Sequence, residues 1–152
     1  MQGLSPVGRA TLLVEIADVG QMFYSGPCLS LVAPAAFGEV CILPRHTPFL
    51  SKLTPGEIRL LTEQDERLSY YVSGGYLEVN NSVVTVLADY MERSADIDRA
   101  AALAAKAAAE CTLRTSPLDS ERDLAKLELV KAIAQLRVLE HIDTIKLRTH
   151  RR

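Results

Sequence analysis

Residues 96–111 read DIDRAAALAAKAAAEC, with eight alanines in sixteen positions and neither glycine nor proline. Alanine loses the least free energy on entering a helix, and Leu, Glu, Lys and Arg follow it closely. All 8 glycines and six of the 7 prolines of the chain lie before residue 76. The chain is therefore made of two unlike parts: a helical part that begins near residue 96, and a preceding part that turn-forming residues interrupt at short intervals.

The part before residue 96 predicts a set of short β-strands. Runs rich in Val, Leu, Ile and Tyr are separated by turn formers, roughly every 8 to 12 residues. The expected strands are residues 11–17, 21–25, 28–33, 37–43, 57–63, 68–72, 76–79 and 83–88. About seven to ten short strands without a helical pattern between them indicate a β-sandwich or a closed, flattened sheet. Residues 12–14 and 83–87 are apolar on both faces, so we expect another body to cover one outer face of the sheet.

Three connections carry specific turn signals. Residues 44–48, PRHTP, hold two prolines and cannot form an interior strand, so we expect an exposed loop there. Residues 80–82, NNS, predict a hairpin turn because Asn tolerates a positive φ. Residues 73–75, SGG, have the glycine content of a phosphate-binding loop, but a strand pattern follows them instead of a helix. We expect a turn or bulge there that needs the backbone freedom of glycine.

The helical part predicts a hairpin of two helices with unequal lengths. Asp96 is the expected cap of a first helix over residues 97–111, whose mostly methyl surface buries little area. Ser116 and Pro117 signal the start of a second helix of about thirty residues, with no breaker up to the end of the chain. An apolar stripe on this helix needs a surface besides the first helix, either the β part or another protein. The stripe consists of Leu127, Val130, Ala134, Val138, Ile142 and Ile145.

Composition excludes several classes of protein. Hydrophobic residues make up 48% and charged residues 24%, as in ordinary soluble proteins, and no apolar run is long enough to cross a bilayer. Residues 1–10 lack the pattern of a signal peptide, so we expect a cytoplasmic protein. The three cysteines are far apart and lack CxxC spacing, which indicates neither a zinc site nor disulfides, and we expect them to be buried as small apolar residues.

Charge is distributed unevenly between the two parts. Residues 1–95 have a charge balance of −4, and residues 96–152 have a balance of +2. The last seven residues contain Lys146, Arg148, Arg151 and Arg152 and no acid. Such an end is either a solvated terminus or a contact with an acidic partner surface.

Five segments, in order and over nearly the whole chain, resemble the epsilon subunit of F-type ATP synthases. They are FGEVCILPRHTPFL (37–50), LTPGEIR (53–59), YVSGGYLEV (71–79), VVTVLAD (83–89), and AK (125–126) with KAIAQLRVLE (131–140). The resemblance implies an α+β protein with an N-terminal antiparallel β-sandwich over residues 1–92 and a C-terminal antiparallel two-helix hairpin over residues 93–152.

The resemblance also implies a function. In that family the sandwich binds the foot of the gamma stalk and sits on the membrane c-ring, so it turns with the rotor. The hairpin folds down on the sandwich or rises along gamma into the alpha and beta subunits, where it restrains ATP hydrolysis. We therefore expect a non-catalytic rotor subunit without a cofactor or metal, one copy per complex, that couples proton or sodium flow to ATP synthesis. It would be peripheral, at the cytoplasmic face of a bacterial plasma membrane, and would bind no nucleic acid.

Site residues follow from matched positions. Glu39 and His46 match family positions in loops at the end of the sandwich that faces the c-ring, so we expect them to contact the ring or gamma. Without the resemblance each would be interpreted as a solvated loop side chain. Four neighbours, Val40, Cys41, Arg45 and Thr47, replace the commoner Leu, Gly, Gly and Ala. On the helical arm, Arg137, Lys146 and Arg148 are expected to meet acidic surface of alpha and beta when the hairpin is extended.

A nucleotide site is the remaining possibility that the resemblance raises. Some members of the family bind ATP in the hairpin through Ile or Leu, Asp, two variable residues, and then Arg-Ala. The matching residues are Ile97, Asp98, Ala101 and Ala102, so alanine stands where the arginine belongs. Loss of a guanidinium removes charge-assisted hydrogen bonds to phosphate, and Arg99 lies about 200° around the helix from Ala101. We expect ATP binding to be weak or absent.

Two other classes of function are compatible with the residues alone. One is a free-standing β-sandwich adaptor whose hairpin captures a helical partner, and co-purification with alpha, beta and gamma subunits separates it from the rotor subunit. The other is an enzyme, which turnover by the isolated chain would reveal. No nucleophile with its base, pair of acids or metal cluster stands in motif spacing in the sequence, although distant residues can converge.

Overall fold

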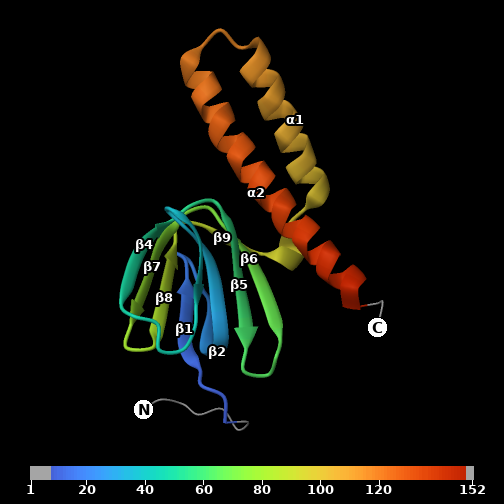
Figure 1. Ribbon diagram of the computed structural model, residues 1–152. Helices are drawn as coiled ribbons and strands as arrows, with labels where there is room; N and C mark the ends of the chain where they lie inside the picture. Colours follow the sequence, from blue (N-terminus) through green and yellow to red (C-terminus); the bar gives the residue numbers. More distant parts are fainter. Residues whose placement is uncertain (1–7, 150–152) are drawn as a thin grey trace. The chain divides into compact units, whose positions relative to one another are not determined.

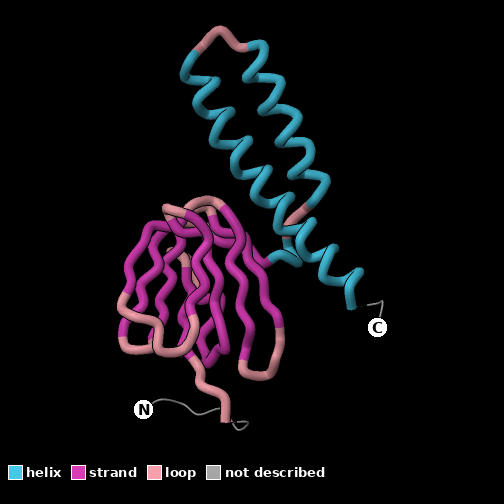
Figure 2. The backbone as a smooth tube through the Cα atoms, in the orientation of Figure 1, coloured by secondary structure: helices cyan, strands magenta, loops and turns pink. Residues whose placement is uncertain are grey.

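The computed structural model describes residues 8–149 and divides the chain into two compact units, the first ending at Glu92 and the second beginning at Arg93. The first unit consists of strands, and the second consists mainly of two antiparallel helices (Figures 1 and 2). The predicted α+β class, with a β-sandwich and a two-helix hairpin, is confirmed. Arg151 and Arg152 of the basic end lie outside the described residues.

Within residues 8–149 the structure has nine strands. They are β1 (Leu12–Ala17), β2 (Met22–Ala35), β3 (Gly38–Ile42), β4 (Phe49–Leu53), β5 (Gly56–Thr62), β6 (Arg67–Val72), β7 (Gly75–Asn80), β8 (Val83–Ala88) and β9 (Met91–Arg93). Hydrogen-bonded neighbours follow the order β1-β8-β7-β4-β2-β5-β6-β9, with β3 paired to β2. β1 and β8 run parallel, whereas the pairs β1–β2, β2–β5, β5–β6, β4–β7 and β7–β8 are antiparallel.

The long strand β2 belongs to both layers of the sandwich. Its first half pairs with β1, where Val14 stands opposite Gly26, and its second half pairs with β3 and β5, where Val32 stands between Cys41 and Arg59. The register against β5 shifts between Cys28 and Ser30, as it does at a β-bulge. The prediction of two strands separated at Gly26-Pro27 is therefore wrong. The register against β1 runs unbroken through Gly26 and Pro27, so these two residues do not end the strand.

One continuous core holds the two layers together. It consists of the inward-facing side chains of alternate strand positions, such as Leu12, Val14 and Ile16 on β1 and Ile58 and Leu60 on β5. All members of this cluster lie between Leu12 and Met91. The first unit therefore has a core of its own. Burial of apolar surface contributes roughly 25 cal/mol per Å² and is the main stabilisation of a small sandwich.

The sequence missed the two strands β4 and β9, but it was right about the loop before β4 and the hairpin turn between β7 and β8. β4 follows the PRHTP loop directly, and β9 is only three residues long, so neither shows a clear alternating pattern. Residues 44–48 form a loop, as predicted. At the hairpin between β7 and β8, Asn81 and Ser82 have φ of 48° and 66°, which confirms the predicted turn.

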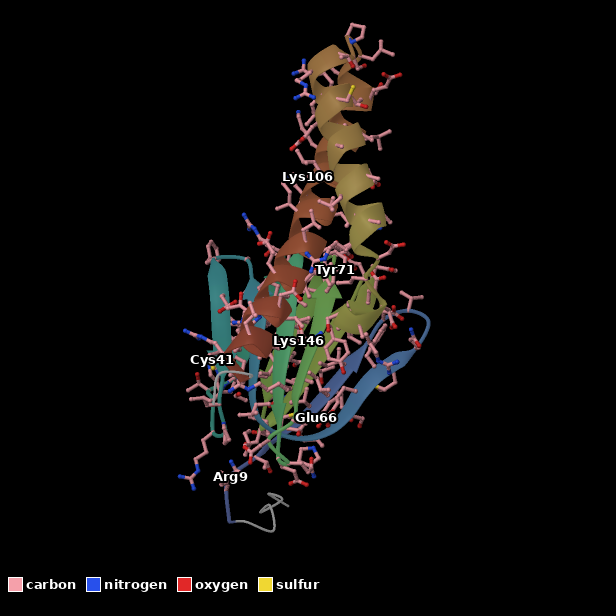
Figure 3. The ribbon with its side chains drawn as sticks, turned by 90° about the vertical axis from the view of Figure 1, so that its right-hand side faces the viewer. Arg9, Cys41, Glu66, Tyr71, Lys106 and Lys146 are labelled. Carbon is pink, nitrogen blue, oxygen red and sulfur yellow. The ribbon has the colours of Figure 1, made fainter. Side chains whose placement is uncertain are left out.

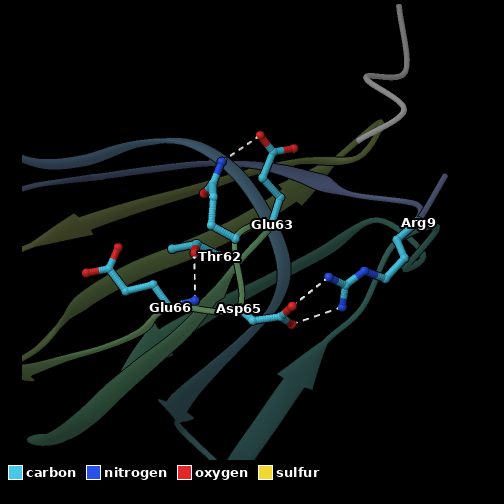
Figure 4. A network of polar contacts seen from close by, with 6 residues as sticks. Arg9, Thr62, Glu63, Asp65 and Glu66 are labelled. Carbon is cyan, nitrogen blue, oxygen red and sulfur yellow. Dashed lines mark hydrogen bonds and ion pairs between the residues drawn. The ribbon is translucent and has the colours of Figure 1, made fainter. Parts of the chain in front are cut away.

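An exposed ion pair ties Arg9 to the hairpin between β5 and β6 (Figure 4). Both guanidinium nitrogens of Arg9 donate to Asp65, at 2.9 and 2.7 Å. The hydrogen bonds from Arg9 lower the pKa of Asp65 below its ordinary value, although desolvation works in the opposite direction. Within the same turn the backbone N–H of Glu66 donates to the Thr62 hydroxyl at 3.1 Å.

Both helices begin two residues later than the sequence predicted, and α1 also ends later. A short 3-10 turn covers Ser94–Asp96, and α1 (Arg99–Thr115) begins after Asp98, whose carboxylate accepts a hydrogen bond from the Ala101 N–H at 3.0 Å. Asp98 is therefore the N-cap, and the prediction of Asp96 is wrong. Both acids suit the start of a helix, and the cap is the one whose carboxylate reaches a free backbone N–H.

Helix α2 (Asp119–Thr149) starts two residues after Pro117. Ser116 is the C-cap of α1, and its hydroxyl also donates to Glu121 in the first turn of α2 at 2.5 Å. The prediction of Ser116 as the cap and Pro117 as the first residue of α2 is wrong, because both residues belong to the connection between the helices. With 31 residues against 17, α2 is about 46 Å long and α1 about 25 Å.

The apolar stripe of α2 is covered only in part. Leu127 and Val130 are exposed, Ala134 and Val138 are buried, and Ile142 and Ile145 are half-buried. On α1 the buried residues are Ala102 and Ala109, whose methyl groups each cover little area. The part of α2 near the hairpin tip therefore keeps large apolar side chains in contact with water.

At Gly75 the backbones of β7 and β8 lie too close together to leave room for a side chain. The φ of Gly75 is +125°, and a Cβ at this position would lie 2.1 Å from the carbonyl oxygen of Leu87. Gly38 has a similar φ of +129° with nothing within 4 Å, so it is the matched control. We expect Gly75→Ala to lower the free energy of unfolding by at least about 3 kcal/mol and Gly38→Ala by about 1–2 kcal/mol, measured by chemical denaturation. Equal losses would show that the close approach to Leu87 is unimportant.

Candidate partner-binding surfaces

The outer face of β4, β7 and β8 exposes several large apolar side chains. Tyr76 of β7 stands directly opposite Leu87 of β8, and both point away from the core, with 51% and 59% of their surface exposed. Leu50 of β4, 70% exposed, lies on the same face two positions along from Lys52, the partner of Tyr76. Leu50, Tyr76 and Leu87 are called the outer apolar face below. The sequence predicted that part of such a face would be apolar, from residues 83–87, but not that Leu50 and Tyr76 would join it.

Glu39 lies inside strand β3 and not in a loop, which corrects the expectation from the sequence. Its carboxylate accepts a hydrogen bond from Nη2 of Arg59 at 2.6 Å. Arg59 also donates to Glu57 at 3.2 Å, and the Ser69 hydroxyl donates to Glu57 at 2.6 Å. Burial lowers the pKa of Arg59, but the hydrogen bonds to Glu39 and Glu57 outweigh it, so the pKa is raised and the guanidinium stays charged.

His46 lies at the other end of β3, in the loop before β4. The backbone N–H of His46 donates to Leu43 O at 3.0 Å, and its ring Nδ1 lies 2.7 Å from its neighbour Thr47's carbonyl oxygen. The ring meets Phe49 edge to face, with centroids 5.9 Å apart. Arg45, where glycine is commoner in the resembling family, has a φ of 67°. The structure therefore does not bring Glu39 and His46 together, because the length of β3 separates them.

The three basic residues predicted for the arm do not form one patch. Arg137 and Arg148 are eleven residues apart, which places them about 20° apart around α2. Lys146 is nine residues from Arg137 and therefore lies about 180° from it. Lys146 is in the last turn of the helix, where Figure 3 labels it. Arg137 and Arg148 are both exposed, so they present one basic stripe along α2.

The residues that match the nucleotide motif have structural roles in the described hairpin. Asp98 caps α1, Ala102 is buried, and Ile97 is 8% exposed. Ala101 is exposed and offers no charge. Arg99 donates to Asp143 of α2 at 2.5 Å, so its guanidinium is already engaged by a carboxylate. This arrangement provides no arginine at the position where the motif has one.

The cysteines differ from the sequence-based expectation. Cys28 is buried in the core, and its burial raises the pKa of the thiol, in line with a small apolar role. Cys41 and Cys111 are exposed, so the prediction is wrong for both. Cys41 lies on the outer face of strand β3, and Cys111 lies on the outer face of helix α1.

No group of three or more His, Cys, Asp or Glu side chains within residues 8–149 is arranged to hold a metal ion. In that same part of the chain, no helix combines the length and the hydropathy needed to cross a bilayer.

Comparisons with known proteins match both units. The model of the ATP synthase delta/epsilon chain β-sandwich domain matches residues 11–94, and that of the delta/epsilon chain long α-helix domain matches residues 95–140. The ATP synthase epsilon chain of Nitrosococcus oceani is 50% identical over 134 residues, 87% of this chain and 94% of the relative. The epsilon chain of Halorhodospira halophila is 46% identical, over 88% of this chain and 95% of the relative.

A solved structure shows the same fold. In the cryo-EM structure of the Euglena gracilis mitochondrial ATP synthase (OSCP, F1 and c-ring), one chain superposes with a TM-score of 0.79 at 20% identity, covering 85% of this chain and 81% of that one. Together, the family models and the relatives at 46–50% identity identify the chain. It belongs to the ATP synthase delta/epsilon chain family, whose epsilon chains are non-catalytic subunits of that enzyme.

Proposed function

We propose that this chain is a central-stalk subunit of an F-type ATP synthase, bound to the gamma subunit and the c-ring through its sandwich. It turns with the rotor, couples proton or sodium flow to ATP synthesis, and restrains ATP hydrolysis through its helical arm. Its place is at the cytoplasmic face of a bacterial plasma membrane, reached through the complex. Support comes from the curated bacterial relatives named epsilon chain and from the fold shared with a chain of a mitochondrial ATP synthase.

One observation carries the proposal: the sandwich and the arm each expose a surface that suits a protein partner. The outer apolar face lies on the sandwich, and polar residues such as Lys52 and Glu78 stand beside it. An exposed apolar patch with a polar rim is typical of a protein-binding surface. The arm offers a second surface, because Leu127 is 69% exposed and Arg137 and Arg148 are exposed on the same helix. A base that docks and an arm that contacts other subunits require such a division.

We assign the outer apolar face to the gamma subunit, and the ends of β3, with Glu39 and His46, to the ring or gamma. A few well-packed side chains at the centre of an interface, Tyr prominent among them, contribute most of its free energy, whereas charged groups at the rim mainly set orientation and rate of association. The assignment therefore gives the rotor contact an apolar centre and a polar edge. It does not require any catalytic group on this chain.

The docking surface is tested by a charge on the outer apolar face. Leu87→Glu buries a carboxylate in the proposed interface, so we expect the affinity for gamma to fall about 10- to 100-fold, measured by titration of the purified gamma complex. Val19→Glu is the control, because Val19 is 96% exposed in the turn between β1 and β2 and outside the outer apolar face. Normal binding by Leu87→Glu would remove this face from the docking site.

The regulatory arm is tested by deleting the residues after Ala95. Because the core cluster ends at Met91, we expect the shortened chain to assemble into the complex. ATP hydrolysis should rise about 5-fold or more, as for a coupling free energy of about 1–3 kcal/mol. Arg137→Glu with Arg148→Glu should give a smaller rise if the basic stripe holds the arm, whereas Arg114→Glu in the last turn of α1 should not. Unchanged hydrolysis in the deletion would disprove the regulatory role.

ATP binding is expected to be weak in the isolated full-length chain. Because Ala101 has no guanidinium and Arg99 is paired with Asp143, titration calorimetry should give a dissociation constant above about 1 mM. Ala101→Arg supplies the missing donor on an exposed helical position and should tighten binding by about tenfold or more. A micromolar constant for the unchanged chain would contradict the prediction.

A further inference from the structure

A polar cluster crosses the outer surface of the sheet that contains β3, β2, β5 and β6. Arg59 stands opposite Val32 of β2 on one side and Ser69 of β6 on the other. Val32 in turn stands opposite Cys41 of β3, two residues from Glu39. Because side chains two apart in a strand share a face, Glu39, Arg59, Glu57 and Ser69 all lie on the face opposite Ile58 of the core.

Arg59 is the centre of this cluster. Its Nη2 donates to Oε1 of Glu39 at 2.6 Å, and its Nη1 donates to Oε2 of Glu57 at 3.2 Å. The other oxygen of Glu57 accepts from the Ser69 hydroxyl at 2.6 Å. The guanidinium is thus fixed from one side by Glu57, which β6 holds in place, and reaches across β2 to Glu39 on the other side. A planar group with several donors can bridge two carboxylates in this way, and an ammonium does so less well.

The bridge changes what Glu39 can offer to a partner. The Glu39 side chain is 56% exposed, and a glutamate in that situation ordinarily samples several rotamers. Here one carboxylate oxygen is held by Arg59, and Oε2 makes no hydrogen bond to another described residue. A donor on a partner therefore meets an acceptor whose position is already set, which lowers the entropy lost on binding.

We propose that Arg59 is a positioning residue for the contact between Glu39 and the rotor. It orients the Glu39 carboxylate so that the free oxygen accepts a hydrogen bond from a cationic or N–H donor on the c-ring or gamma. The proposal rests on the proposed function, because Glu39 must lie in that interface for Arg59 to act through it. Arg59 itself need not touch the partner.

A double-mutant cycle on the full-length chain tests the proposal. The variants are Glu39→Gln, Arg59→Met and both together, each titrated into ATP synthase complex from the same organism that has been depleted of this chain. We expect Glu39→Gln to weaken binding about tenfold and Arg59→Met about threefold, with no further loss when Arg59→Met is added to Glu39→Gln. Arg59→Lys should recover part of the affinity. Arg67→Met is the control, since Arg67 is an exposed arginine at the start of β6.

The possible results separate two kinds of failure. If Arg59→Met weakens binding equally with and without Glu39→Gln, Arg59 acts on the fold alone, and thermal unfolding of each variant will show the matching loss. If Arg59→Met leaves the affinity unchanged, the hydrogen bond between Arg59 and Glu39 contributes nothing to binding. Either result overturns the positioning role while the subunit still docks. If Glu39→Gln binds as tightly as the unchanged chain, Glu39 is outside the interface and the proposal fails with it. Failure of the unchanged chain to bind would overturn the proposed function itself.

Discussion

The first unit depends on one constraint: a single strand has to supply hydrogen bonds to both layers of the sandwich. β2 does this over 14 residues, pairing with β1 from Met22 to Cys28, with β5 from Cys28 to Val32 and with β3 from Leu31 to Ala35. Since buried backbone groups must find partners, sharing β2 between the two layers lets the sheet close over one core. The same pairing fixes which residues face outward. Arg59 and Cys41 flank Val32 on the outer surface because Val32 is paired on both sides. The polar cluster around Arg59 is thus a consequence of the pairing of β2 with both β3 and β5.

The second unit follows a different physical rule. Helix α1 buries alanine methyl groups, which allow the helices to approach closely but contribute little area each. Polar contacts at its two ends also hold α1 in place. Asp98 caps the helix, Arg99 forms an ion pair with Asp143, and the Ser116 hydroxyl donates a hydrogen bond to Glu121 across the hairpin connection. Exposed ion pairs are worth little, roughly 0–1 kcal/mol each. An arm built this way keeps Leu127 and Val130 open to water, which suits a segment proposed to contact several subunits in turn.

Sequence reasoning succeeded where the signal was local and failed where it was not. The turn at residues 80–82 and the loop around Pro44 could be predicted, because Asn tolerates a positive φ and proline fixes its own φ. β9 is too short to show a period, and the role of Asp98 depends on which of two acids reaches a helix N–H. The candidate site divides in the same way. Family resemblance pointed to Glu39, but its partner Arg59 lies twenty residues away and no spacing rule connects them.

By itself the sequence determined that the chain has a β part and a helical part, that the arm is rich in alanine, and that the arginine of the nucleotide motif is missing, because these features depend only on residue type and spacing. The tertiary structure decided that β2 is one strand, that Tyr76 and Leu87 are neighbours on an exposed face, and that Arg59 bridges Glu39 and Glu57. The physical reason is register. Which residues stand beside each other across strands is set by pairings between distant segments, and a shift by one residue would reverse every face.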